Sequence, residues 1–206
     1  MSETYDLNLV EHRTPALPGE VRVFDHDHQA LDALALALLA AAQGALERGP
    51  SFSVALAFGP ALDRLCTLLC IDPRFRAIPW EQASVWLHDA DPADPVVADV
   101  REGLIEHVPV EPQRFHVVAP GSPAGRAALT EDAALTPVPD RHDAWLIDAA
   151  AARPDGRPLP TRAAFLLAIG PDARPAVRAA EQGLGPLPTL ARADPRWYLD
   201  AAAVAE

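Results

Sequence analysis

The chain has 206 residues, half of them apolar, and its formal net charge at pH 7 is -12. This length and composition predict one domain with a substantial core. Nucleic-acid binding needs clustered positive charge, and no basic stripe is visible, so we expect no nucleic-acid partner.

Every fixed side-chain cation is arginine, because the sequence contains no lysine. Arginine binds phosphate and carboxylate groups bidentately, but it cannot form a Schiff base. The composition therefore excludes Schiff-base catalysis and a phosphate-binding lysine.

The N-terminal stretch "MSETYDLNLVEHRTP" is polar and acidic, without the basic and apolar regions of a secretion signal. The most apolar run, residues 30–42, is interrupted by Asp32 and is shorter than the roughly 20 residues that span a bilayer. We expect a cytoplasmic protein with no membrane association.

Hydrophobic patterning predicts strands and helices that alternate along the first half of the chain. The predicted strands lie at 20–25, 51–58, 84–89 and 114–120, with helices at 28–49, 60–70 and 94–108 between them. Such alternation is typical of a mostly parallel sheet with helices on both faces, which is an α/β fold.

The second half begins with residues 119–141, which hold proline, glycine, threonine and aspartate around one short alanine-rich segment and are predicted to form a long loop or a poorly formed helix. Further strands are predicted at 143–148 and 161–170, followed by a helix at 172–183 and a terminal segment at 196–205. We find no internal repeat and no second apolar core, so we predict a single domain over residues 1–206.

Ligands of parallel α/β sheets bind at the carboxyl ends of the strands. Five residues at predicted strand ends are candidate ligand-binding residues: Phe58, Gly59, Asp89, Asp148 and Gly170. His88, at a strand end, and His142, just before a strand, are the candidate catalytic bases.

Two further groups of polar residues resemble metal ligands but favour another interpretation. Residues 25–28 read Asp-His-Asp-His, and consecutive residues rarely converge on one ion, so we interpret them as a strand end followed by a helix N-cap. Cys66 and Cys70 are interpreted as thiols that point into the core. We predict no metal site and no cofactor.

Several segments, taken in order, carry a resemblance to a known family. They are "VRVFDHDHQALDALALALLAAAQ", "IPWEQASVWLHDADPADP", "DPVVADVREGLIEHVPV", "AAFLLAIGPDARPAVRAA" and "PLPTLARADPRWYLDAAA". Their order and spacing are similar to the 6-phosphogluconolactonase family, relatives of glucosamine-6-phosphate isomerase/deaminase. The resemblance implies a Rossmann-like three-layer sandwich and a connection to the pentose phosphate pathway.

The family's chemistry is not matched by the corresponding residues. Its phosphate turn "sGGSTP" falls on "AFGPAL", residues 57–62, where one glycine remains and Pro60 lacks a backbone N–H. Its "DER" falls on Asp89, Ala90 and Asp91, which replaces an arginine by a carboxylate. These changes disfavour binding of a phosphorylated sugar.

The family's general base is the histidine of "GmGpDGHtASLFPg", which follows the strand "fDlvLLG". Here "DAWLID" is followed by a shortened segment, residues 149–161, in which "PDGR" places Arg157 on the histidine. Arginine cannot be deprotonated near neutral pH, so it cannot act as a base.

These departures lead to two hypotheses. In the first, the protein is inactive as a lactonase and serves as an interaction or regulatory module for another protein, such as a catalytic relative or a pathway enzyme. In the second, it is an active lactonase or related hydrolase of a small sugar-like ligand, with a relocated base such as His88 or His142. Phe58 either plugs the former cleft or stacks on a different ligand.

Overall fold

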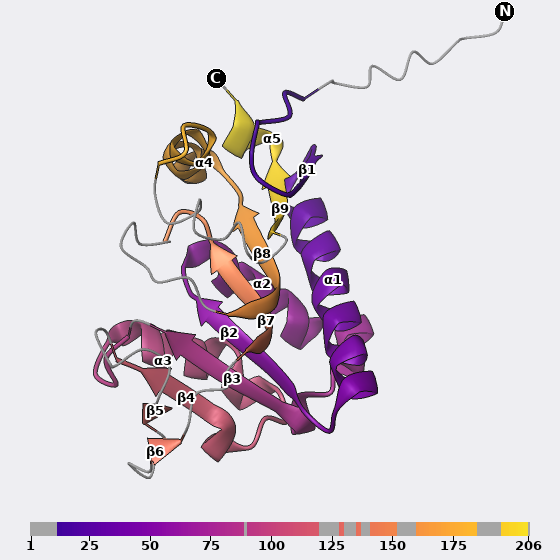
Figure 1. Ribbon diagram of the computed structural model, residues 1–206, viewed down its shortest axis with the longest axis vertical. Coiled ribbons are helices and arrows are strands. Elements are labelled where there is room, and N and C mark those ends of the chain that lie inside the picture. Colours follow the sequence, from indigo (N-terminus) through magenta and orange to yellow (C-terminus); the bar gives the residue numbers. More distant parts are fainter. Residues whose placement is uncertain are drawn as a thin grey trace, which may run out of the picture.

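A computed structural model describes residues 12–88, 90–119, 128–129, 135–136, 141–151, 160–184 and 195–205 (Figure 1). The strands are β1 (Glu20–Phe24), β2 (Phe52–Ala57), β3 (Ala83–His88), β4 (Phe115–Val118), β5 (Ala128–Leu129), β6 (Leu135–Thr136), β7 (His142–Asp148), β8 (Thr161–Ala168) and β9 (Pro195–Asp200). The α-helices are α1 (Asp27–Arg48), α2 (Pro60–Ile71), α3 (Pro95–Gly103), α4 (Arg174–Glu181) and α5 (Ala201–Val204).

The strands form one sheet in the order β1-β9-β8-β7-β2-β3-β4-β5-β6. The seven strands from β1 to β4 in this order are parallel to one another, whereas β5, among the described strands, pairs antiparallel with both β4 and β6. The predicted α/β fold with a mostly parallel sheet is confirmed. Because the strands are parallel, β2, β3, β7, β8 and β9 all end at the same edge of the sheet.

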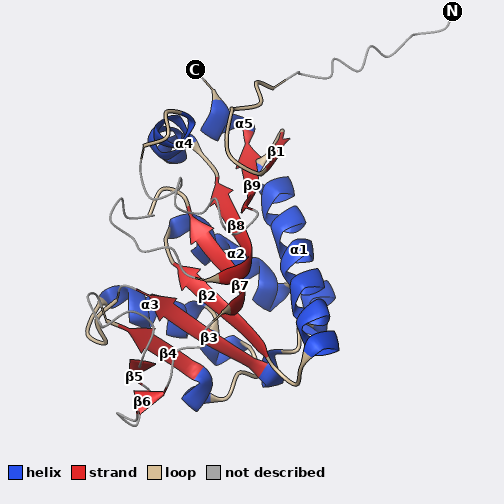
Figure 2. Cartoon of the chain, in the orientation of Figure 1, coloured by secondary structure: helices blue, strands red, loops and turns tan. Residues whose placement is uncertain are grey.

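Helices cover both faces of this sheet, as Figure 2 shows. The larger core lies on one face, where α1, α2 and α3 pack on side chains such as Leu56, Leu87 and Leu146. The smaller core lies on the other face, where α4 and α5 pack on side chains that include Leu166 and Trp197. The predicted three-layer sandwich is therefore confirmed.

Helix α1 is long and apolar enough, by length and composition alone, to cross a membrane. In the structure its residues Ala30, Leu34 and Leu38 are fully buried, and the helix packs along the sheet. It has the place of a core helix in a folded domain.

Two details of the structure differ from the prediction. The predicted loop 119–141 contains β5 and β6, whose two-residue strands are too short to show any sequence period. Helix α3 ends at Gly103, five residues before the predicted end, because Leu104 leaves helical geometry (φ -134°, ψ -61°) and a 3-10 turn, Ile105–His107, follows.

Candidate functional site

The turn between β2 and α2 holds a carboxylate that belongs to the protein itself. Strand β7 lies beside β2 and ends at Asp148, whose side chain is 1% exposed. Its Oδ2 atom accepts a hydrogen bond from the Ala61 N–H at 2.8 Å, and its Oδ1 atom accepts one from the Ala150 N–H at 2.9 Å. The amino end of α2, which is the kind of site that binds phosphate, is thus occupied by an internal anion.

Gly59 makes this contact possible. Its φ of -167° is extended backbone that any residue adopts, so a conformational requirement does not explain the glycine. A Cβ atom at this position would lie 2.6 Å from Asp148 Oδ2 and 2.5 Å from Ala151 Cβ. The glycine therefore provides the space in which the Asp148 carboxylate reaches α2.

Burial raises the pKa of Asp148, and hydrogen bonds from backbone N–H groups, led by those of Ala61 and Ala150, partly counteract that rise. The net shift is upward, so the backbone donors compensate only part of the cost of burying this charge. A second anion beside Asp148 would meet a like charge as well as fewer free donors. The arrangement disfavours phosphate at this turn.

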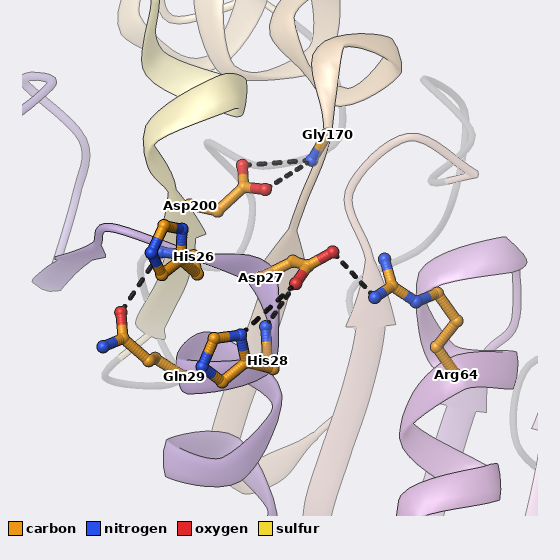
Figure 3. Close-up of polar contacts among 7 residues, drawn as sticks. All are labelled: His26, Asp27, His28, Gln29, Arg64, Gly170 and Asp200. Atoms are coloured by element: carbon orange, nitrogen blue, oxygen red, sulfur yellow. Dashed lines mark hydrogen bonds and ion pairs between the residues drawn. The ribbon is translucent and has the colours of Figure 1, made fainter.

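A second carboxylate caps the end of β8 (Figure 3). Both oxygens of Asp200 lie 3.0 Å from the Gly170 N atom, and Oδ1 also accepts from the Ala203 N–H at 2.8 Å. Gly170 has a φ of +76°, a conformation that favours glycine. Gly170 is a predicted ligand-binding residue, and its N–H is bonded within the protein.

Three residues of the 25–28 segment, His26, Asp27 and His28, lie at the start of α1 (Figure 3). The Gln29 side chain accepts a hydrogen bond from the His26 N–H, which confirms that this segment is a helix N-cap. Asp27 pairs with Arg64 of α2 at 2.7 Å, and this hydrogen bond holds the pKa of Asp27 below its usual value. Within the described ranges, no group of three or more His, Cys, Asp or Glu residues could hold a metal ion.

The two candidate bases lie against each other. The Nε2 atoms of His88 and His142 are 3.3 Å apart, and the Nδ1 atom of His142 lies 2.8 Å from the Ser53 hydroxyl. Burial lowers the pKa of His88 to about 3 and that of His142 to about 4, so both rings are neutral at pH 7. His142 is 1% exposed, and its ring also meets the Trp86 ring edge-on, with the ring centroids 5.7 Å apart.

Burial restricts what this pair can do chemically. A general base must reach the proton that it abstracts, either directly or through one water. His142 is too buried to meet a substrate from solvent, while His88 is half-buried. The geometry fits a neutral hydrogen-bonded pair within the protein better than a base at an open site.

Two of the remaining predicted site residues, Phe58 and Gly59, lie together. Phe58 is half-buried, packs against the larger core and lines a groove with Gly59. Asp89 and residues 152–159, which include Arg157, lie outside the described residues. Cys66 is buried as predicted, whereas Cys70 is only half-buried, with its thiol 3.6 Å from the Gly103 carbonyl oxygen.

Sequence reasoning missed three contacts: Asp148 with α2, Asp200 with Gly170, and Asp27 with Arg64. Asp148 and Asp200 share a feature that is visible in the sequence, because each is the last residue of a mostly buried strand. A carboxylate in that position has backbone N–H groups of the next turn within reach, so an internal cap is its simplest role.

No protein-family model matches the sequence, and no curated protein matches it either. Solved structures do match the fold. A DevB protein aligns with a TM-score of 0.63 and 17% identity over 89% of this chain and 97% of its own. The 6-phosphogluconolactonase from Thermotoga maritima aligns with a TM-score of 0.59 and 14% identity, over 88% and 99% of the two chains.

A monomeric glucosamine-6-phosphate deaminase of the NagB superfamily is similar to the same extent, with a TM-score of 0.59 and 12% identity over 90% of this chain and 100% of its own. The low identities make this a likeness of fold. The chain therefore has the fold shared by 6-phosphogluconolactonases and this deaminase, as the resemblance in its sequence implied.

Proposed function

We propose that this protein is a divergent 6-phosphogluconolactonase-like protein that does not hydrolyse the lactone and serves as an interaction or regulatory module for another protein. The single observation that carries the proposal is the Asp148 carboxylate at the amino end of α2. It occupies the backbone donors that a phosphorylated substrate would need there.

The family resemblance supports this interpretation. Placed without a gap, "DAWLID" aligns with the last six positions of the family strand "fDlvLLG", and Asp148 falls on the glycine. Replacing a glycine by an aspartate at this point adds the carboxylate that fills the turn. Like the loss of a glycine at Phe58 and the absence of the family's histidine, this change disfavours binding and hydrolysis of a phosphorylated substrate.

The test is a lactone hydrolysis assay with the purified wild-type protein and 6-phosphogluconolactone. We expect the hydrolysis rate to equal the uncatalysed rate. Robust turnover that disappears in a folded His88→Gln variant would overturn the proposal and assign His88 as the relocated base.

The interaction role requires a separate test. The protein, purified from its native cell under mild conditions, should elute in a stoichiometric complex whose second component is a catalytic relative or a pathway enzyme. Elution as a lone monomer under all native conditions would contradict this role.

One observation favours the second hypothesis, an active hydrolase of an uncharged sugar-like ligand. His88 ends β3, at the carboxyl edge of the sheet, and is only half-buried, although its lowered pKa of about 3 makes the imidazole a weak base. The same assay with unphosphorylated gluconolactone tests it. Turnover of this compound by the wild type, and not by His88→Gln, would favour the hydrolase.

A further inference from the structure

A groove of about 590 Å³ runs between the amino-terminal turn of α2 and helix α3. We call it the α2–α3 groove. Three of its lining residues are apolar and three are acidic: Phe58, Pro60 and Val96, and Asp63, Asp99 and Glu102. Its volume lies within the range of sites that hold small ligands or side chains.

The three carboxylates of the groove are exposed, and none of them forms an ion pair within the described part of the chain. Nearby arginines are engaged elsewhere: Arg64 pairs with Asp27, and Arg101 of α3 lies with its guanidinium over the Phe115 ring. The groove therefore gathers negative charge that no described cation of the protein neutralises.

The apolar wall determines the shape of a suitable cation. Phe58 is half-buried and lines the groove, and an aromatic ring attracts a cation that reaches its face. Pro60 and Val96 provide surface against which an aliphatic stem packs. A guanidinium or ammonium group on such a stem matches both parts of the groove, whereas a phosphate is repelled.

We propose that the α2–α3 groove binds an arginine or lysine side chain of a partner protein. The inference rests on the proposed function for the existence of that partner, and it adds the place and the chemistry of recognition. The groove borders the turn that Asp148 closes, so the edge of the sheet used for phosphate in relatives of this sequence would here take a cation.

The probe for this proposal is Nα-acetyl-arginine methylamide, with the uncharged citrulline analogue as its isostere. Titration into the full protein, followed by ¹H–¹⁵N NMR, should shift the amides of Phe58 and Val96 with the arginine probe and not with the citrulline probe. The lysine probe should shift the same amides. Equal shifts with citrulline, or no shift at these amides, would overturn the proposal.

A matched pair of variants separates the groove from net charge. Asp99→Asn with Glu102→Gln should weaken binding of the arginine probe at least tenfold. Asp91→Asn with Glu106→Gln removes the same charge from exposed residues that do not line the groove and should leave binding unchanged. Equal weakening in both variants would overturn the proposal.

The failure of this proposal and that of the proposed function give different results. Lactone turnover by the wild type would overturn the proposed function, whatever the probe does. Absence of arginine binding in a protein that lacks lactone turnover would overturn the proposal for the α2–α3 groove and leave the proposed function standing.

Discussion

Gly59 and Asp148 form one close contact, and it explains why the turn "AFGPAL" keeps a glycine in the absence of a phosphate loop. The Cβ of an alanine at position 59 would overlap the Asp148 carboxylate. The carboxylate could move away from this Cβ only by giving up the hydrogen bonds from its backbone donors. That loss is costly because Asp148 is buried and water cannot replace the donors. The absence of a side chain at Gly59 therefore leaves room for the Asp148 carboxylate.

We therefore expect Gly59→Ala to lower the free energy of unfolding by about 2 kcal/mol, since overlap in a packed site costs on this order. Gly49→Ala is the matched control, because Gly49 is also extended and a Cβ there would meet nothing within 4 Å. Urea denaturation measures both. Equal stability of the two variants would show that the Gly59 contact carries no constraint.

Removal of the carboxylate should change the cost of that substitution. In the Asp148→Gly background, an alanine at position 59 no longer meets the Asp148 carboxylate. Gly59→Ala should therefore lower the free energy of unfolding by less than it does in the wild type. A double-mutant cycle measures the difference. Additive effects of the two substitutions would contradict a direct contact between them.

At the scale of the elements, β3, β4 and β7 bring imidazole rings together on the sheet. His88 contacts His142, and His116 stacks on Trp86 with ring centroids 4.0 Å apart. Burial lowers the pKa of all three histidines. The folded protein thus holds neutral rings that become protonated more readily after unfolding.

The consequence is a stability that depends on pH. The unfolded chain binds protons near pH 6.5, whereas folded His88 and His142 bind them only near pH 3 and 4, so the free energy of unfolding falls as the pH drops below 6.5. From pH 7 to pH 5 we expect a loss of roughly 1 to 2 kcal/mol for each of the two histidines.

Urea denaturation at the two pH values tests this expectation. His142→Gln should reduce the pH dependence, while His107→Gln, at an exposed histidine, should leave it unchanged. If His142→Gln had the same pH dependence as the wild type, the ring would not be held neutral by burial.

At the scale of the whole molecule, the sheet should exchange its amide hydrogens unevenly. Strands β7 and β8 lie inside the sheet and are mostly buried, whereas β1 is an edge strand with no buried residue. We expect β7 and β8 amides to exchange only through global unfolding and β1 amides to exchange faster through local opening. Hydrogen exchange with mass spectrometry reports this, and uniform protection of the three strands would contradict it.

Much of the fold could be predicted from the sequence because its strands are buried in a parallel sheet. The runs at 51–58, 84–89 and 143–148 each contain an uninterrupted apolar stretch, and they correspond to β2, β3 and β7 with ends shifted by at most one residue. The two-residue strands β5 and β6 carry no such pattern, so they could not be found.

The candidate site was predictable in its location but not in its contacts. Phe58, Gly59 and Asp148 do lie near one another at the carboxyl ends of their strands. Whether a carboxylate there faces a ligand or the chain depends on the packing of two strands that are far apart in sequence. The contact between His88 and His142 could not be predicted for the same reason, because these residues are 54 positions apart in the sequence.

The most direct test of the central claim measures whether the amino end of α2 is closed to anions. ¹H–¹⁵N spectra of the wild type, titrated with 6-phosphogluconate, should show no saturable shift of the Ala61 and Leu62 amides. Asp148→Gly, which frees these donors, should show such shifts. Saturable shifts at Ala61 and Leu62 in the wild type would contradict the claim that Asp148 replaces the phosphate.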